Sequence, residues 1–86
     1  MNEVIQELEC ALDSIIRNIV SDDKFTVQSS LEDSMVTLSV KAPSSELGKI
    51  IGKKGDMASS IRKVLRAMGQ KRGVGIKFSI DNRPEE

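Results

Sequence analysis

The first twenty residues carry apolar side chains at three- and four-residue intervals. The apolar positions are Val4, Leu8, Ala11, Leu12, Ile15, Ile16 and Ile19. This spacing predicts an amphipathic helix over residues 3–20, with Asn2 as its N-cap and residues 21–23 ending it. Cys10 falls opposite the apolar stripe, so we expect it to lie off the core face.

Two segments then alternate between apolar and polar residues, which is the period of a β-strand. The first covers residues 24–28 and the second covers residues 35–41, and residues 29–34 between them, which are polar apart from Leu31, predict a turn. The positions expected to face inward are Phe25, Val27, Val36, Leu38 and Val40. The pattern therefore predicts a β-hairpin.

A short helix and a longer helix follow in the second half of the chain. Pro43 ends the second strand because proline has no N–H for the ladder, and Ser44 is the expected N-cap of a helix that reaches residue 51. The longer helix is expected over residues 56–68, with Gly69 as its C-cap. Its expected buried stripe consists of Met57, Ala58, Ile61, Val64, Leu65 and Met68.

A third alternating segment completes the pattern. Residues 74–81 predict a third strand, and residues 82–86 form a polar tail. The element order predicts an α+β fold, a two-layer sandwich of order α-β-β-α-α-β with helices on one face of a three-stranded mixed sheet. The helical connection between the second and third strands favours placing them side by side and parallel. We expect a single domain over residues 1–81.

Composition excludes several kinds of chemistry. The chain of 86 residues has no histidine, and Cys10 is its single cysteine. Catalysis by histidine, histidine-bound metal and an intrachain disulfide are therefore ruled out, and the lone cysteine suits a reducing compartment. No apolar run reaches the roughly 20 residues that a membrane span needs. We therefore expect a cytoplasmic protein that is not an enzyme, does not act at a membrane, and uses no metal and no cofactor.

The net charge is zero, but charge is segregated along the chain. Residues 1–46 hold three basic residues against nine acidic ones, whereas residues 47–80 hold nine basic residues against one acidic residue. Such a cluster is the sequence form of a basic surface, which attracts polyanions.

The basic half contains the run Gly52-Lys53-Lys54-Gly55. Glycine adopts backbone angles closed to other residues and leaves room for the backbone of another molecule. Main-chain N–H groups at such a turn, where a helix begins, point towards anions, and the two lysines add positive charge. The run therefore predicts a binding site for a phosphodiester backbone. A Walker-type nucleotide loop is disfavoured, since only three residues separate Gly48 from Gly52 and the lysines are not followed by Ser or Thr.

The residues around this run resemble the signature of KH RNA-binding domains. The run LGKIIGKKG ends at Gly55 and is followed by Ala58, Ile61, Arg62, Leu65 and Ala67. The element order is similar to the type II arrangement of prokaryotic KH domains. The length is similar to that of small stand-alone bacterial KH proteins of the KhpA type, and the resemblance covers nearly the whole chain.

This resemblance implies single-stranded RNA binding without catalysis, with the loop clamping about four nucleotides. The two glycines would let the RNA backbone approach, the two lysines of the loop would neutralise phosphates, and two isoleucines would support the loop from the core side. The residues implicated in RNA binding are Lys49, Ile50, Ile51, Gly52, Lys53, Lys54, Gly55 and Arg62.

Proteins of this family form homodimers or bind a second, larger KH-containing RNA-binding protein, so the resemblance implies these partners as well. The corresponding role is that of a post-transcriptional regulator or an RNA chaperone. Two alternatives stay open: a KH fold that binds mainly protein, and binding of single-stranded DNA, since no residue visibly reads the 2′-hydroxyl group.

Overall fold

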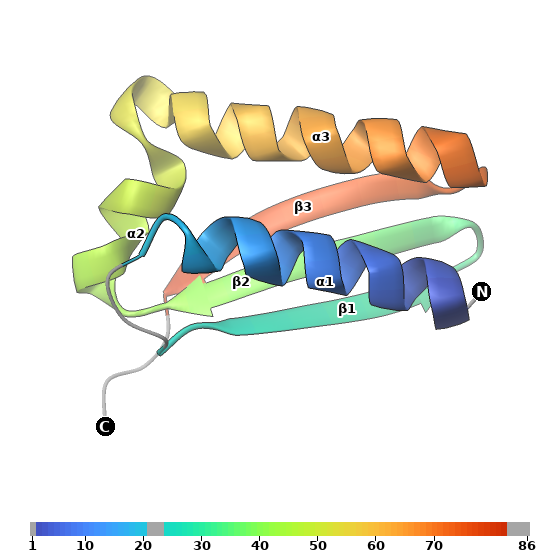
Figure 1. The fold of residues 1–86 in the computed structure, drawn as a ribbon, viewed down its shortest axis with the longest axis horizontal. Helices are drawn as coiled ribbons and strands as arrows, with labels where there is room; N and C mark the ends of the chain where they lie inside the picture. The colour runs from blue at the N-terminus through green and yellow to red at the C-terminus, as the bar shows by residue number, and fades with distance from the viewer. Residues whose placement is uncertain (1, 21–23, 83–86) are drawn as a thin grey trace.

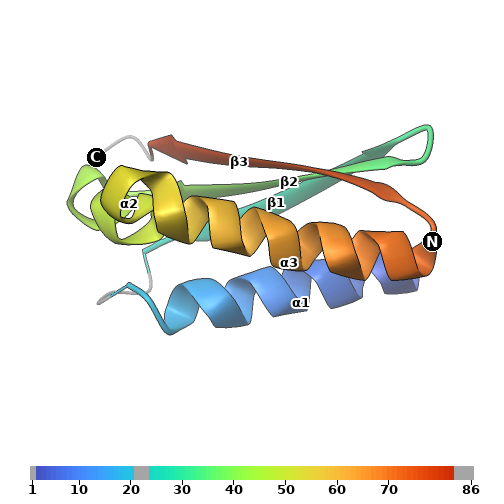
Figure 2. The ribbon, with the colours of Figure 1, turned by 90° about the horizontal axis from the view of Figure 1, so that it is seen from above.

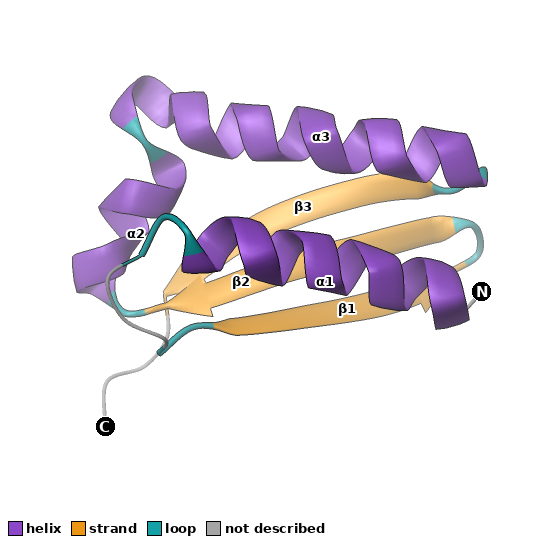
Figure 3. Cartoon of the chain, viewed as in Figure 1, coloured by secondary structure: helices purple, strands orange, loops and turns teal. Residues whose placement is uncertain are grey.

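A computed structural model describes residues 2–20 and 24–82, and the order of its elements agrees with the prediction (Figure 3). The elements are α1 (Asn2–Arg17), β1 (Thr26–Glu32), β2 (Met35–Ala42), α2 (Ser44–Ile51), the 3₁₀ turn η1 (Lys53–Gly55), α3 (Asp56–Arg72) and β3 (Gly75–Asn82). Within this described part, no helix is long and apolar enough to cross a membrane.

The three strands form one mixed sheet in the order β1-β2-β3. β1 and β2 pair antiparallel as a hairpin, whereas β2 and β3 pair parallel, which the long connection through α2 and α3 allows. In the central strand, Leu38 lies between Ser29 of β1 and Phe78 of β3. Helices α1 and α3 lie side by side over one face of the sheet, and α2 lies at the end where β2 and β3 finish (Figures 1 and 2). The predicted two-layer α+β fold is confirmed.

The core lies between the sheet and this helical layer. Its largest fully buried side chains are Leu8, Leu12, Ile16, Val36, Leu38, Val40, Ile50 and Leu65. Each such side chain contributes about 1.5–3 kcal/mol through removal of apolar surface from water. The predicted inward face of the second strand and the centre of the stripe on α1 are confirmed.

Helix α1 ends at Arg17, earlier than predicted, and Asn2 lies inside its first turn rather than at its N-cap. The side-chain amide of Asn18 donates a 2.7 Å hydrogen bond to the carbonyl of Ser14. Asparagine competes for backbone acceptors in this way, which favours the end of a helix. The predicted break at residues 21–23 lies outside the described residues.

Strand β1 begins two residues later and ends four residues later than predicted. The polar stretch after residue 28 keeps the alternation of a strand, because Ser29 and Leu31 pair with Leu38 and Val36 of β2. Only two residues are left to form the turn, and Asp33 there adopts a left-handed backbone with a φ of 56°. Aspartate tolerates this conformation, and two residues are enough to join antiparallel strands.

The start of α2 differs by one residue from the prediction. The carbonyl of Pro43 accepts N–H bonds from Glu46 at 2.9 Å and from Leu47 at 3.2 Å, so Pro43 and not Ser44 is the N-cap. The hydroxyl of Ser44 instead donates to Oδ1 of Asn82 at 3.2 Å. Asn82 is the last residue of β3, not part of the predicted polar tail. The other tail residues lie outside the described part of the chain.

Helix α3 runs on to Arg72, and Gly73, with a φ of 77°, is its C-cap. The predicted C-cap, Gly69, is buried within the helix. A Cβ at Gly69 would lie 2.5 Å from Cγ1 of Ile76, so this glycine lets α3 pack closely on β3.

The buried stripe of α3 is narrower than predicted. Ile61 and Leu65 are buried as expected, whereas Met57 and Val64 are 38% and 48% exposed. The sheet and α1 cover only part of the circumference of α3, so apolar side chains at the border of the stripe stay at the surface.

Candidate nucleic-acid interface

The GKKG loop (residues 52–55) joins α2 to α3 at one end of the molecule (Figure 1). The N–H of Gly52 donates to the carbonyl of Gly48 at 2.9 Å and closes α2 where the sequence predicts its end. The N–H of Gly55 donates back to the carbonyl of Gly52 at 3.2 Å. Gly52, Lys54 and Gly55 have positive φ angles of 77°, 56° and 78°, so the chain reverses within one turn.

The two glycines of the loop have different surroundings. A Cβ at Gly52 would lie 2.6 Å from Cβ and 2.8 Å from the backbone nitrogen of Met57, so the chain itself fills that space. A Cβ at Gly55 would meet nothing within 4 Å. Gly52 therefore allows the loop to close on α3, and Gly55 is the glycine whose open side an approaching molecule can reach.

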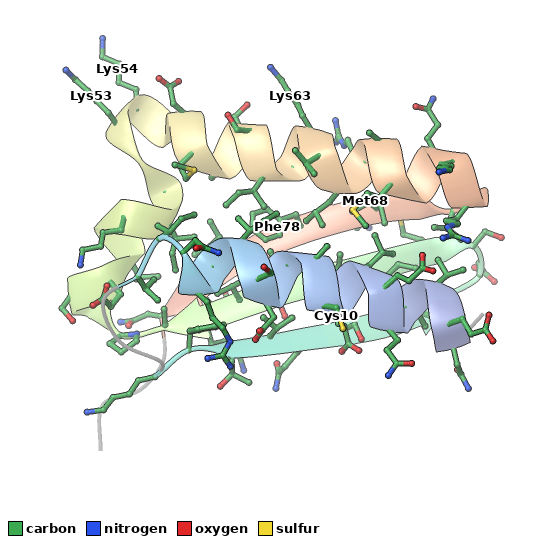
Figure 4. The ribbon with its side chains drawn as sticks, viewed as in Figure 1. Cys10, Lys53, Lys54, Lys63, Met68 and Phe78 are labelled. Atoms are coloured by element: carbon green, nitrogen blue, oxygen red, sulfur yellow. The ribbon has the colours of Figure 1, made fainter. Side chains whose placement is uncertain are left out.

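The two lysines of the loop are exposed, and their side chains point away from both layers of the fold (Figure 4). The ion pairs found among the described residues do not include Lys53 or Lys54. Lys49, also predicted to bind RNA, pairs with Glu46 at 3.2 Å, and this contact offsets part of its charge. Two of the three predicted lysines thus present their charge to solvent at the loop.

The start of α3 adds partial positive charge to the same place. Gly55, in a left-handed conformation, is the N-cap, and no side chain caps this end of the helix. The N–H of Asp56 donates to the carbonyl of Lys53, so an external acceptor would have to use the N–H groups that follow it in the first turn. Asp56 is the first helical residue, and its exposed carboxylate reduces the net positive charge beside the loop.

The isoleucines before the loop divide between core and surface. Ile50 is fully buried, as expected for a residue on the core side of the loop. Ile51 is 40% exposed, so the expectation of a core position for it is wrong. Successive residues of a helix point about 100° apart, and the short α2 turns only one of the two isoleucines inward. Met57, which the sequence suggested only as core, lies beside Gly52 and fills the space that a Cβ there would need.

The basic surface continues along α3. Arg62 is half-buried, and it lies about 10 Å along the helix axis from Gly55 at 1.5 Å per residue. Lys63 is exposed and points to the same side of the molecule as the loop lysines (Figure 4). Arg62 is thus one or two phosphate spacings away from the loop, and not within it.

The arrangement suits the binding of an anion with a repeating charge. Left-handed residues next to a helix start orient main-chain N–H groups into an anion-binding concavity, and nearby lysines strengthen it. No cluster of three His, Cys, Asp or Glu side chains fit to hold a metal occurs in residues 2–20 and 24–82. Cys10 is exposed on α1, as predicted, and lies away from the loop (Figure 4).

Comparison with known proteins gives one family. The sequence model of the KhpA/KhpB KH domain matches residues 9–80, which include the loop, the helices on both sides of it and most of the sheet. A comparison with curated proteins gives no match. Since the match covers most of the chain and the element order and sheet are those of a KH domain, the protein belongs to the KhpA/KhpB KH-domain family, which is built on an RNA-binding fold.

Proposed function

We propose that this protein binds single-stranded RNA without catalysing a reaction, and that the phosphodiester backbone sits on the GKKG loop. The observation that supports this most directly is the open side of Gly55, next to two exposed lysines and the uncapped start of α3. A phosphate can approach there without displacing any part of the chain. Its charge would be met by N–H groups and ammonium groups together.

The rest of the proposed contact follows from the position of each predicted residue. Lys53 and Lys54 would neutralise the phosphates nearest the loop, and Arg62 would meet the backbone further along α3. Lys49 would contribute less, because its ion pair with Glu46 has to be weakened first. Ile51 and Met57 are exposed beside the loop and would give apolar contact to a base or sugar.

The test compares RNA binding of the wild type with that of a Lys53→Asp, Lys54→Asp double variant, by fluorescence anisotropy of a labelled single-stranded RNA pool. Aspartate is chosen because Lys54 has a φ of 56°, a conformation that aspartate tolerates. A matched control carries Lys41→Glu and Lys77→Glu, which change the net charge equally on the open face of the sheet. Circular dichroism establishes that all three proteins are folded.

Loss of binding in the loop variant alone supports the proposal. Equal loss of RNA binding in both variants shows that binding depends on the overall charge of the protein. That result contradicts a specific binding site at the loop. Absence of binding even by the wild type favours the alternative of a protein-binding KH domain, for which exposed Ile51, Met57 and Val64 would be the contact residues. The same assay with single-stranded DNA shows whether the sugar is distinguished.

We further propose that the protein acts in the cytoplasm as a post-transcriptional regulator or RNA chaperone. One clamp for about four nucleotides gives weak binding by itself. A second copy, or a second KH-containing RNA-binding protein, would raise the affinity through effective concentration.

A further inference from the structure

Glu46, in the first turn of α2, is buried although it is a charged residue. Its side chain is only 10% exposed, and no other charged residue is buried in residues 2–20 and 24–82. A buried charge is unfavourable unless a group of opposite charge accompanies it. Nζ of Lys49 lies 3.2 Å from Oε2 of Glu46, and the lysine side chain is 45% exposed. The pair therefore joins a buried carboxylate to a lysine at the surface.

The pair holds the ammonium group of Lys49 on the side away from the GKKG loop. Glu46 precedes Lys49 by three residues, and the loop begins three residues after it, at Gly52. Residues three apart are neighbours on a helix surface, separated by about 4.5 Å along the axis at 1.5 Å per residue. The pairing draws the side chain of Lys49 towards the start of α2, whereas Lys53 and Lys54 lie beyond its end.

A phosphate at the loop therefore has to compete with Glu46 for Lys49. Release of Lys49 would take from a buried carboxylate the cation that lies 3.2 Å from it, and this is unfavourable. Lys53 and Lys54 are exposed and take part in none of the ion pairs found among the described residues. They can meet a phosphate without this cost.

We infer that Glu46 is a positioning residue that holds Lys49 away from the loop and thereby limits the affinity for the RNA backbone. Neutralising Glu46 is expected to free Lys49, whose long flexible side chain can then reach a phosphate near the loop. This inference rests on the proposed function. It adds that a residue outside the loop sets how many lysines the site offers.

The test measures the RNA affinity of a Glu46→Gln variant by fluorescence anisotropy at several salt concentrations, with the labelled single-stranded RNA pool. Glutamine keeps the size of the side chain, so it disturbs least the further interaction that Glu46 makes within the chain. Binding is expected to tighten about two- to five-fold, the effect of one exposed ion pair. The slope of the salt dependence is expected to steepen by about 0.7, the value for one added phosphate contact.

Two further variants separate the release of Lys49 from the change in charge. Glu32→Gln makes the same change in charge at the hairpin end of β1, far from the loop (Figure 1), and is expected to leave affinity and slope unchanged. Lys49→Gln is made in the wild type, where little effect is expected, and in the Glu46→Gln variant, where it is expected to remove the whole gain. Urea unfolding followed by circular dichroism gives the folded fraction by which each affinity is corrected.

Two results would overturn the inference and leave the proposed function intact. The first is a wild type that binds RNA and a Glu46→Gln variant that binds it no more tightly. The second is an effect of Lys49→Gln that is the same with and without Glu46→Gln, which would show that Glu46 does not restrain Lys49. If neither the wild type nor the Glu46→Gln variant binds RNA, the proposed function fails and the inference fails with it.

Discussion

Replacing Gly52 by alanine tests whether this glycine is required by the fold rather than by a ligand. Gly52 has a φ of 77° and a ψ of 176°, a region that is essentially restricted to glycine. The added Cβ would also lie 2.6 Å from Cβ and 2.8 Å from the backbone nitrogen of Met57. Both effects act on the folded state, so we expect the variant to be destabilised.

The magnitude follows from these two effects. A residue forced into a backbone region that it disfavours costs about 1–3 kcal/mol. An extra methyl group in a filled space costs about 1–3 kcal/mol more, because Met57 is held by the backbone of α3. Alanine also lowers the conformational entropy of the unfolded chain, which stabilises the folded protein by about 0.4–1 kcal/mol. The net loss is roughly 1–6 kcal/mol, which in a domain of this size lowers the melting temperature by at least about 4 °C.

Gly55→Ala is the matched control, since Gly55 has a φ of 78° but space around it. Its cost is the left-handed backbone alone, about 1–2 kcal/mol before the gain in the unfolded state. Urea unfolding of the three proteins, followed by circular dichroism, gives the difference. The reasoning is refuted if Gly52→Ala is no less stable than Gly55→Ala, or lies within about 0.5 kcal/mol of the wild type, the usual range of surface substitutions.

Three further predictions follow from the same structure. If the protein contacts about three phosphates of the RNA, the logarithm of the binding constant should fall with the logarithm of the salt concentration with a slope near −2. A binding constant that does not depend on salt would contradict the proposed binding of the RNA backbone at the loop. Gly69→Ala should lower the free energy of unfolding by about 1–3 kcal/mol in urea, because its Cβ would lie 2.5 Å from Ile76 and 2.9 Å from the carbonyl oxygen of Val74; a gain in stability would show that helix propensity outweighs the contact. Leu38→Ala, in the centre of the sheet, should lower the same quantity by about 2–5 kcal/mol, and a loss below 1 kcal/mol would show that the core closes around the vacancy.

The strands and helices were predictable where one periodicity matched one buried face. The central strand alternates apolar and polar residues. Its apolar side chains, Val36, Leu38 and Val40, are fully buried in the core between the sheet and the helices. The stripe on α1 behaves in the same way, with Leu8 and Leu12 at its centre. In both cases the sheet and the helix each present one face to the core, so local pattern and global packing agree.

The errors lie where tertiary contact decides between local alternatives. Gly69 and Gly73 are both reasonable ends for α3, and only the close approach of β3 shows that the first is a packing position. Ser29 is polar enough for a turn, but the pairing with Leu38 keeps it in β1. Ser44 is a good capping residue by type, yet Pro43 already supplies the carbonyl that begins α2.

The same limit applies to the loop, where sequence alone gives Gly52 and Gly55 one role. Both have positive φ angles that favour glycine, so both are needed for the turn. Only the packing of Met57 separates them, because it fills the space beside Gly52 and leaves the space beside Gly55 open. Gly52 is therefore required for packing within the protein, whereas Gly55 leaves space for a ligand. Substitution of Gly52 should act first on stability, and a bulky residue at Gly55 should act on binding while the protein stays folded. A loss of RNA binding in a Gly52 variant consequently has to be corrected for its unfolded fraction before it is attributed to contact with RNA.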